Sequence, residues 1–253
     1  MYLGFTFRSF EKRESTERKS GNRCEFGILF DFNGVIIDDE PLHFLAFRDI
    51  FKKEGIRLTK GDYYARYLAF DDRSCIREIL SDNHRELSTA FVTRLQQAKK
   101  RAYRALLKTR LRPFPGAIQF IRECAAGYPL AIASGALSSE IDLILGAFRL
   151  RRYFAAVVSA DDVIHGKPHP ETFLRAWKAL NRRRPRGEKK ILVTECLVIE
   201  DSLHGIKAAH QAGMRCVAVA HSYPLRELAH ADFRARSIGS LQLSQLESLF
   251  ADD

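Results

Sequence analysis

The sequence lacks the features that mark membrane-spanning, secreted and P-loop proteins. No apolar run reaches the roughly 18 residues that a transmembrane helix needs, and the first residues lack the apolar segment and cleavage site of a secretory signal. The five cysteines are scattered without a CxxC pair, which favours reduced thiols. No GxxxxGK[ST] loop occurs, so a P-loop NTPase is excluded. We therefore expect a cytoplasmic protein with no membrane segment.

Charge of negative sign is in short supply, since the net charge is +10 over 253 residues. Arginines cluster at 151–152 and 182–186, and such clusters can attract polyanions. No aromatic-interleaved basic stripe and no helix-turn-helix spacing accompanies them, so a solvated surface is favoured over a nucleic-acid partner. Residues 1–24 are polar and basic with no apolar face, which predicts a disordered arm.

The remainder of the chain has the patterning of an α/β protein. Phe26–Phe30 is a short apolar run of the kind that forms a buried strand, and residues 41–110 carry helical periodicity without a convincing strand. After Gly116 the chain alternates between apolar strand-like segments at 129–133, 155–158, 191–199 and 215–220 and helical stretches at 116–126, 137–147, 170–180 and 202–213. The pattern predicts a Rossmann-like parallel-sheet core of residues 25–40 and 111–253, with an inserted all-helical cap at 41–110.

Polar residues stand at four of the predicted strand ends, where open parallel sheets bind ligands. They are Asp31 with Asn33, then Ser134, then Lys167, and finally Glu200–Asp201. Each has an ordinary explanation alone, such as a turn former, a helix cap or a solvated lysine. Adjacent carboxylates repel each other unless a cation neutralises them, and Mg²⁺ is the natural partner because it prefers oxygen ligands. A nucleophile, a hydroxyl, a cation and metal ligands around one point suit phosphoryl transfer.

Four segments resemble, in order, the motifs of the haloacid-dehalogenase-like hydrolases. Residues 31–40 resemble the first motif, Ser134 the second, residues 166–171 the third and residues 200–214 the fourth. The resemblance covers about residues 26 to 250. The most similar subgroup is that of the β-phosphoglucomutase-like phosphatases and mutases, whose four-helix cap corresponds to residues 41–110.

The resemblance implies roles for the residues at the strand ends. Asp31 would be the nucleophile that forms an aspartyl-phosphate, while Ser134 and Lys167 would hold the transferring phosphoryl group. Mg²⁺ would be bound by Asp31, the backbone carbonyl of Asn33 and Asp201, with Glu200 assisting. The implied enzyme is a Mg²⁺-dependent phosphatase of a small phosphorylated metabolite, and we expect a monomer or a weak dimer.

Four further residues are candidates for substrate binding. His43 matches a histidine that the mutase subgroup carries near the hinge into the cap, although a polar residue on a cap helix is an equally ordinary reading. Arg73 resembles cap residues that contact the distal group of the substrate, where a guanidinium would suit a second phosphate or a carboxylate. Gly135 and Ala136, which follow Ser134, complete the set.

Asn33 departs from the family pattern, which usually has a second aspartate two residues after the nucleophile. An amide donates a hydrogen bond but does not exchange a proton at neutral pH. Since general acid–base catalysis is typically worth about 10²–10⁴-fold, the loss corresponds to roughly 3–5 kcal/mol of barrier. The Asn33–Gly34 sequence is also prone to deamidation, which would convert some Asn33 to aspartate.

Three hypotheses accommodate Asn33. The first is a phosphatase of substrates with good leaving groups, such as acyl or aryl phosphates, or one that uses another proton donor such as His43. The second is a sugar phosphomutase, which is disfavoured because a sugar hydroxyl needs a base in each half-reaction. The third is a catalytically weak protein that retains the phosphate and Mg²⁺ pocket.

Overall fold

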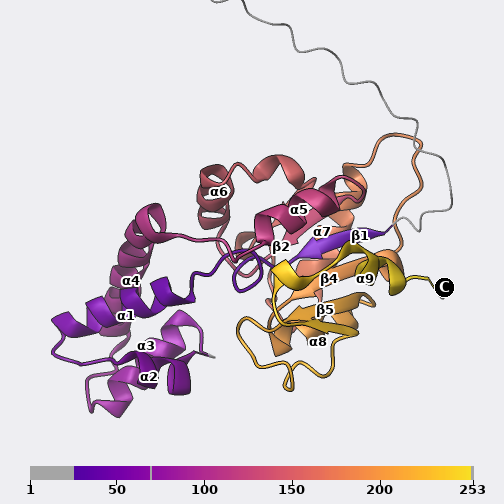
Figure 1. Ribbon diagram of the computed structural model, residues 1–253. Coiled ribbons are helices and arrows are strands. Elements are labelled where there is room, and N and C mark those ends of the chain that lie inside the picture. The colour runs from indigo at the N-terminus through magenta and orange to yellow at the C-terminus, as the bar shows by residue number, and fades with distance from the viewer. Residues whose placement is uncertain (1–25, 69, 252–253) are drawn as a thin grey trace, which may run out of the picture.

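A lobe that contains a parallel sheet is joined to a lobe made of helices in the computed structural model, which describes residues 26–68 and 70–251 (Figure 1). This arrangement confirms the predicted fold class, an α/β core with an inserted helical cap. The disordered arm predicted for residues 1–24 lies outside the described residues. No helix within the described ranges is long and apolar enough to cross a membrane.

The sheet has six strands in the order β3-β2-β1-β4-β5-β6, and every neighbouring pair is parallel. The first and fourth strands of the chain lie side by side at its centre, so the residues that follow them come together at one edge. The strands are β1 (Gly27–Phe30), β2 (Leu130–Ala133), β3 (Ala156–Val158), β4 (Cys196–Glu200), β5 (Arg215–Val219) and β6 (Phe233–Ala235).

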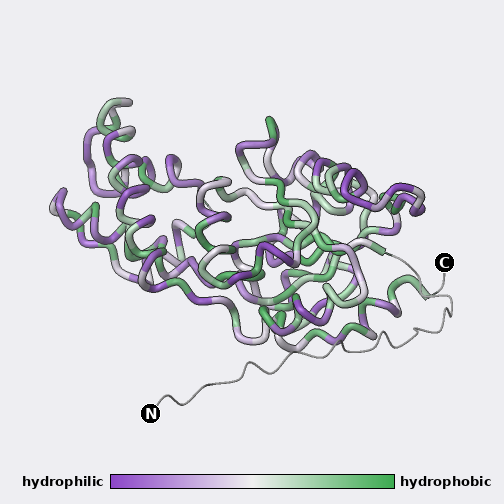
Figure 2. The backbone as a smooth tube through the Cα atoms, turned by 90° about the horizontal axis from the view of Figure 1, so that it is seen from above, coloured by the Kyte–Doolittle hydropathy of each residue, from purple (hydrophilic) through white to green (hydrophobic). Residues whose placement is uncertain are grey.

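Alternate residues of the strands point to opposite faces of the sheet, and each face is covered by helices. Ile28 and Phe30 of β1 pack in one hydrophobic cluster with α5, α6 and α9, whereas Leu29 packs in a second cluster with α7 and α8. Figure 2 shows apolar stretches in the interior of the lobes and polar stretches along their outer turns. These helices are α5 (Ala117–Ala125), α6 (Ser138–Ala147), α7 (Glu171–Arg182), α8 (Leu203–Gln211) and α9 (Leu243–Ser248).

The helical lobe has a hydrophobic core of its own. Phe47, Phe51, Ile76, Leu80 and Leu95 are almost fully buried in one cluster there. Its elements are α1 (Glu40–Lys53), α2 (Lys60–Asp62), the π-helical turn η1 (Tyr63–Tyr67), α3 (Asp72–Asp82) and α4 (Thr89–Arg110). The predicted boundaries of the core and cap domains stay a prediction.

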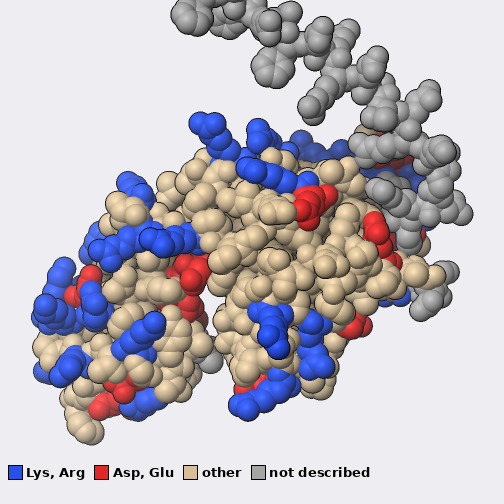
Figure 3. All heavy atoms as spheres, viewed as in Figure 1, with Lys and Arg blue, Asp and Glu red and all other residues tan. Residues whose placement is uncertain are grey.

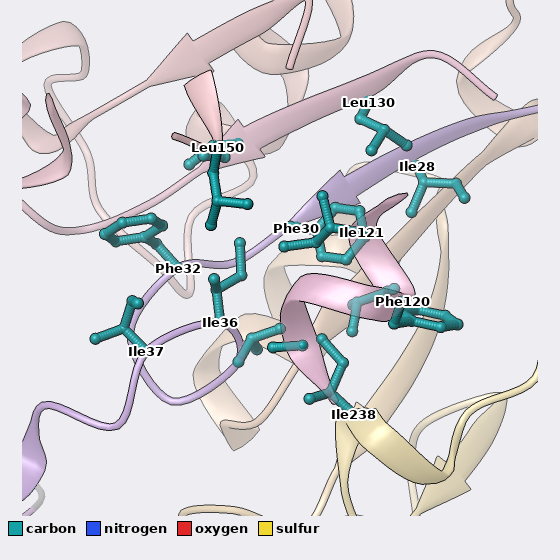
Figure 4. Close-up of a cluster of buried hydrophobic side chains, with 14 of the residues drawn as sticks. Ile28, Phe30, Phe32, Ile36, Ile37, Phe120, Ile121, Leu130, Leu150 and Ile238 are labelled. Atoms are coloured by element: carbon teal, nitrogen blue, oxygen red, sulfur yellow. The ribbon is translucent and has the colours of Figure 1, made fainter. Parts of the chain in front are cut away.

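Two crossings connect the lobes, and they run side by side. The amide of Asp38 donates to the carbonyl of Arg112 over 3.0 Å, and the amide of Phe114 donates to the carbonyl of Ile36 over 3.0 Å. Figure 4 shows Phe32, Ile36 and other apolar side chains of the loop after β1 beside the core residues of the sheet. The loop that carries the first polar residues of the site is therefore anchored by buried apolar side chains.

Three parts of the predicted secondary structure need correction. The strand predicted at 191–199 begins only at Cys196, because the side chain of Glu195 accepts the amide of Leu192 over 2.7 Å and folds the start of the segment into a 3₁₀ turn. The edge strand β6 and the helix α9 were missed. The first has only three residues with Arg234 at its centre, and the second has only six, so neither carries a clear periodicity. The short 3₁₀ turns are η2 (Arg151–Tyr153), η3 (Ala160–Asp162), η4 (Val193–Glu195) and η5 (Ile238–Ser240).

Candidate active site

The loop after β1 brings Asp31 and Asn33 to the edge of the sheet. The amide of Asp31 continues the ladder by donating to the carbonyl of Ile199 over 2.9 Å. Gly34 has φ of +76°, and a Cβ there would lie 2.0 Å from Asp201 Oδ2. Only glycine combines this backbone conformation with so close an approach of a carboxylate.

The end of β4 supplies two buried carboxylates that are held in different ways. Glu200 Oε2 accepts the amides of Asp201 and Ser202 over 2.8 and 2.9 Å and the Ser202 hydroxyl over 2.9 Å. The Ser222 hydroxyl donates to Asp201 Oδ2. A Cβ at Gly205 would lie 1.8 Å from Glu200 Oε1, so this glycine makes room for the carboxylate.

Lys167 bridges the two strand ends. Its Nζ lies 2.5 Å from Asp31 Oδ1 and 2.6 Å from Glu200 Oε1, and it sits 4.6 Å from the centre of the Phe173 ring. The loop that carries Lys167 is braced by Glu171, which accepts the amides of Ile164 and His165 over 3.2 and 3.0 Å. These bonds, with that from the His165 amide the strongest, lower the pKa of Glu171 to about 2.

The charges of the site do not balance. Burial raises the pKa of Asp31 to about 7, although Lys167 pulls it down, and burial with repulsion from Glu200 raises the pKa of Asp201. Burial would raise the pKa of Glu200, but Lys167 lowers it overall. Burial likewise opposes the charge of Lys167, while Asp31 and Glu200 raise its pKa. Three carboxylates thus face one ammonium.

A divalent cation would neutralise this excess of negative charge. Each of Asp31, Glu200 and Asp201 offers a carboxylate oxygen, and the three oxygens lie within 4.8 Å of one another. All three side chains are buried, which makes their mutual repulsion strong. Oxygen ligands of this kind suit a hard cation such as Mg²⁺.

Ser134 lies at the end of β2 on the other side of β1. Its amide donates to the carbonyl of Val158 over 2.9 Å, and its Oγ accepts the amide of Ala136 over 3.0 Å. The hydroxyl is therefore held in place, with its proton free for a ligand.

The strand ends and the helical lobe together line a cavity of about 740 Å³. Figure 3 shows the cleft between the lobes, with acidic atoms along its rim. From the sequence candidates the cavity gathers Asp31, Asn33, His43, Ser134, Gly135, Ala136, Lys167, Glu200 and Asp201.

Arg73 is a candidate that the structure does not bring into this cavity. Its side chain is exposed in the first turn of α3, just after the helix-capping Asp71. Arg73 is not among the residues that line the cavity. The predicted contact of Arg73 with the distal group of the substrate is therefore not supported by this structure.

His43 lines the cavity, but both of its ring nitrogens are used inside the protein. Lys99 Nζ lies 2.7 Å from His43 Nδ1, and His43 Nε2 lies 3.2 Å from Asp39 Oδ2. An ammonium only donates, so Nδ1 must accept and Nε2 must carry the proton. These contacts support a structural role for His43 at the junction of the lobes. They are less consistent with a role as proton donor or substrate contact.

Sequence reasoning missed the residues around His43 and the polar side of α4. Asp39 is 3% exposed and accepts the Tyr103 hydroxyl over 2.5 Å, while Lys99 is 1% exposed and donates to Asp72 over 2.6 Å. The available signal was the helical spacing of the polar residues on α4 that line the cavity, which are Thr93, Gln96, Gln97, Lys99, Lys100 and Tyr103.

The deamidation expected at Asn33 is disfavoured by the fold. The reaction needs attack of the Gly34 nitrogen on the Asn33 side chain. In the structure the Gly34 amide donates to the carbonyl of Ile37 over 2.9 Å, and Asn33 Nδ2 donates to Asp39 Oδ2 over 2.5 Å. The Gly34 amide and the Asn33 side chain are therefore each engaged in a hydrogen bond to another residue, which opposes their reaction with each other.

Comparison with known proteins gives a consistent result. A family model described as haloacid dehalogenase-like hydrolase matches residues 28–219. Fructose-1-phosphate phosphatase YqaB of Escherichia coli (strain K12) is 32% identical over 196 residues, which cover 76% of this chain and 95% of that protein. The chloroplastic 5-amino-6-(5-phospho-D-ribitylamino)uracil phosphatase of Arabidopsis thaliana is 27% identical over 229 residues; the match covers 90% of this chain but only 58% of the relative.

A solved structure of β-phosphoglucomutase from Clostridium difficile has the same fold. It superimposes with a TM-score of 0.72 at 22% sequence identity and covers 90% of this chain and 98% of the mutase chain.

Proposed function

Because the chain belongs to the haloacid dehalogenase-like hydrolase family, we propose that it is a Mg²⁺-dependent phosphatase that acts on a small phosphorylated metabolite through Asp31. The observation that carries the proposal is the position of Lys167 Nζ, 2.5 Å from Asp31 and 2.6 Å from Glu200 at the edge of the sheet. A buried carboxylate beside a buried ammonium, with a held hydroxyl across the cavity, is a receptor for a phosphoryl group.

The reaction has two steps. An oxygen of Asp31 attacks phosphorus and the bond between phosphorus and the leaving oxygen breaks. The leaving oxygen departs with the electron pair of that bond, and an aspartyl-phosphate remains. Water then attacks phosphorus, the bond to Asp31 breaks, and inorganic phosphate leaves. Lys167 offsets the charge of the transferring group throughout, and the Ser134 hydroxyl donates a hydrogen bond to a phosphoryl oxygen.

Asp31, Asp201 and the backbone carbonyl of Asn33 would hold Mg²⁺. Bound there, the cation supplies charge neutralisation for the phosphoryl oxygens. Glu200 has its two oxygens committed to Lys167 and to the Ser202 region, so its part is to fix Lys167 and the start of α8. The burial and crowding of the carboxylates support this assignment, because each would be costly to keep ionised without a cation.

The cavity supports a polar substrate of modest size. Its volume of about 740 Å³ lies within the range of about 300–1,000 Å³ that is usual for small-molecule sites. Gln96, Gln97 and Lys100 of α4 are among the residues that line it. These residues suit a small polar phosphorylated compound, and a relative named for fructose 1-phosphate supports a small phosphorylated metabolite as the substrate. A phosphomutase is less well supported, because Asn33 supplies no base for a sugar hydroxyl.

A phosphatase panel with three proteins tests the proposal. We expect the wild type to release phosphate in the presence of Mg²⁺ and to lose this activity in EDTA. Asp31→Asn should release no phosphate in either condition. The matched control is Asp49→Asn, which makes the same change on an exposed aspartate of α1. Intact mass of quenched reactions should show a phosphorylated species in the wild type and none in Asp31→Asn.

Two outcomes would contradict the proposal. Activity that survives in Asp31→Asn would mean that another residue receives the phosphoryl group. No release from any phosphate, together with Mg²⁺-dependent binding of inorganic phosphate by calorimetry, would identify a binding protein instead of an enzyme.

A further inference from the structure

The side chain of Asn33 is held in one orientation by Asp39. Asn33 Nδ2 lies 2.5 Å from Asp39 Oδ2, and a carboxylate only accepts hydrogen bonds. The amide must therefore present its NH₂ group to Asp39, because the opposite orientation would set two oxygens against each other. The contact is protected from water, since Asp39 is 3% exposed.

The same oxygen of Asp39 is fixed by the helical lobe. The Tyr103 hydroxyl of α4 donates to Oδ2 over 2.5 Å, and His43 Nε2 of α1 lies 3.2 Å from it. Lys99 holds the other nitrogen of His43, and Asp72 holds Lys99. Asp39 thus ties the amide in the core to two helices of the cap.

The other atom of the amide has no partner. Asn33 Oδ1 is buried and accepts no hydrogen bond from any residue in the ranges 26–68 and 70–251. Asn33 also lines the cavity together with Asp31 and Lys167. An unsatisfied buried carbonyl is costly, so the bond from Nδ2 to Asp39 holds the amide in this orientation against that cost.

We propose that Asp39 is a positioning residue that holds the NH₂ group of Asn33 and prevents it from donating to the leaving oxygen of a substrate. The proposal rests on the phosphatase function proposed above and narrows its substrate class. Acyl and aryl phosphates fit, because their leaving oxygen departs with the electron pair of the broken bond as a carboxylate or phenolate and needs no proton.

The second step also balances without a base at this position. Water attacks phosphorus while Asn33 Nδ2 stays bonded to Asp39 Oδ2. The electron pair of the bond from phosphorus to Asp31 returns to Asp31, and both protons of the water end on the released phosphate. Asn33 neither gains nor loses a proton.

This geometry decides which substitutions are informative. Asn33→Asp alone places a second carboxylate 2.5 Å from Asp39, where the two repel each other. Asp39→Asn alone leaves two amides that can face either way. The double variant Asn33→Asp/Asp39→Asn restores one donor and one acceptor between these two positions, with their places exchanged, at the cost of the bonds that His43 and Tyr103 make to Asp39 Oδ2.

The four proteins of this cycle, with Asp49→Asn as the matched control, are compared by thermal unfolding in EDTA. Each single substitution should lower Tm by roughly 5–10 °C, and the double variant should lose clearly less than the sum of the two single losses. The bond between positions 33 and 39 is rebuilt there, whereas the bonds from His43 and Tyr103 to Asp39 Oδ2 are not. Asp49→Asn should leave Tm almost unchanged. Additive Tm losses in the double variant would overturn the positioning role of Asp39.

Rates on acetyl phosphate, p-nitrophenyl phosphate, phenyl phosphate and an alkyl phosphate test the substrate class. The wild type should turn over the first two and almost none of the alkyl phosphate, whereas the double variant should gain about 10²-fold or more on the alkyl phosphate by acquiring an acid at position 33. Equal rates of the wild type on aryl and alkyl phosphates would overturn the substrate class. Non-additive Tm losses in the double variant, without turnover of any phosphate, would support the positioning role of Asp39 and contradict the proposed phosphatase activity.

Discussion

Lys167 and Lys99 are both largely buried lysines in the wall of the cavity. Lys167 lies among the groups that can bind ligands, whereas Lys99 lies among groups that join the two lobes. Lys167 Nζ contacts two buried carboxylates and lies 4.6 Å from the Phe173 ring centre. Lys99 Nζ contacts Asp72 and an imidazole, and lies 4.8 and 4.9 Å from the centres of the Phe47 and Tyr103 rings. Both ammonium groups rest on aromatic rings, but their partners differ in charge and burial.

The difference shows where charge is reserved for a ligand. Around Lys167, Asp31, Glu200 and Asp201 leave an excess of negative charge that a cation and a phosphoryl group can use. Around Lys99, Asp72 balances the ammonium. The second carboxylate there, Asp39, is held by hydrogen bonds from neutral side chains, which are Asn33, His43 and Tyr103. The first cluster keeps an excess of negative charge for ligands, whereas the polar groups of the second are paired with one another at the junction between the lobes.

Replacing Lys167 should produce the larger effect. Lys167→Met in EDTA leaves Asp31 and Glu200 without their cation, and loss of one partner of a buried ion pair costs about 3–5 kcal/mol of unfolding free energy. Phosphatase activity should fall by about 10²-fold or more, as when a group that stabilises transition-state charge is removed. Urea unfolding and initial rates measure the two quantities.

The control is Lys207→Met, which removes an exposed lysine from α8. Added Mg²⁺ should narrow the stability gap between Lys167→Met and the wild type, because the cation replaces part of the lost charge. A gap of the same size with and without Mg²⁺ would argue that the carboxylates do not share a site for the cation.

Replacing Lys99 should have a smaller effect of a different kind. Lys99→Met removes the donor to His43 Nδ1, but Asp72 is about one third exposed and can turn to water. We expect a loss of about 1–3 kcal/mol of unfolding free energy, the usual range for a buried polar group left unpaired. Activity should change less than in Lys167→Met, and more through KM than through kcat, because Lys99 holds the cap side of the cavity.

Lys108→Met, at an exposed position near the end of the same helix, is the control. A loss of activity in Lys99→Met as large as that in Lys167→Met would contradict the comparison and place Lys99 among the groups that act on the phosphoryl group.

Much of the first cluster was predictable from the sequence. Strand ends of a parallel sheet meet at one edge, so Asp31, Ser134, Lys167 and Glu200 could be placed together before any coordinates were known. The predicted family, fold class and hydrolase class are confirmed, whereas the individual roles of these residues stay predictions.

The second cluster was not predictable in the same way. The bond from Tyr103 to Asp39 spans 64 positions and depends on how α1 packs on α4. Lys99 stands in a run with Lys100 and Arg101 that is typical of a solvated helix face. The structure also changes the experiment at Asn33, since Asn33→Asp alone would meet the carboxylate of Asp39, a contact that no local pattern indicates.

The smallest expected effect concerns the support of each lysine. Lys99 stands within a helix, whereas the loop of Lys167 is braced by Glu171, whose pKa is lowered to about 2 mainly by the His165 amide. A carboxylate with a folded pKa below its unfolded value near 4.5 stabilises the fold above pH 4.5, and that stabilisation fades as pH falls toward 2. Glu171→Gln should therefore lower the urea midpoint slightly at pH 7, and the gap to the wild type should narrow below about pH 4.5. Glu78→Gln, an exposed change on α3, should show no such narrowing. A gap that is constant from pH 7 to pH 3.5 would mean that the charge of Glu171 does not support the loop.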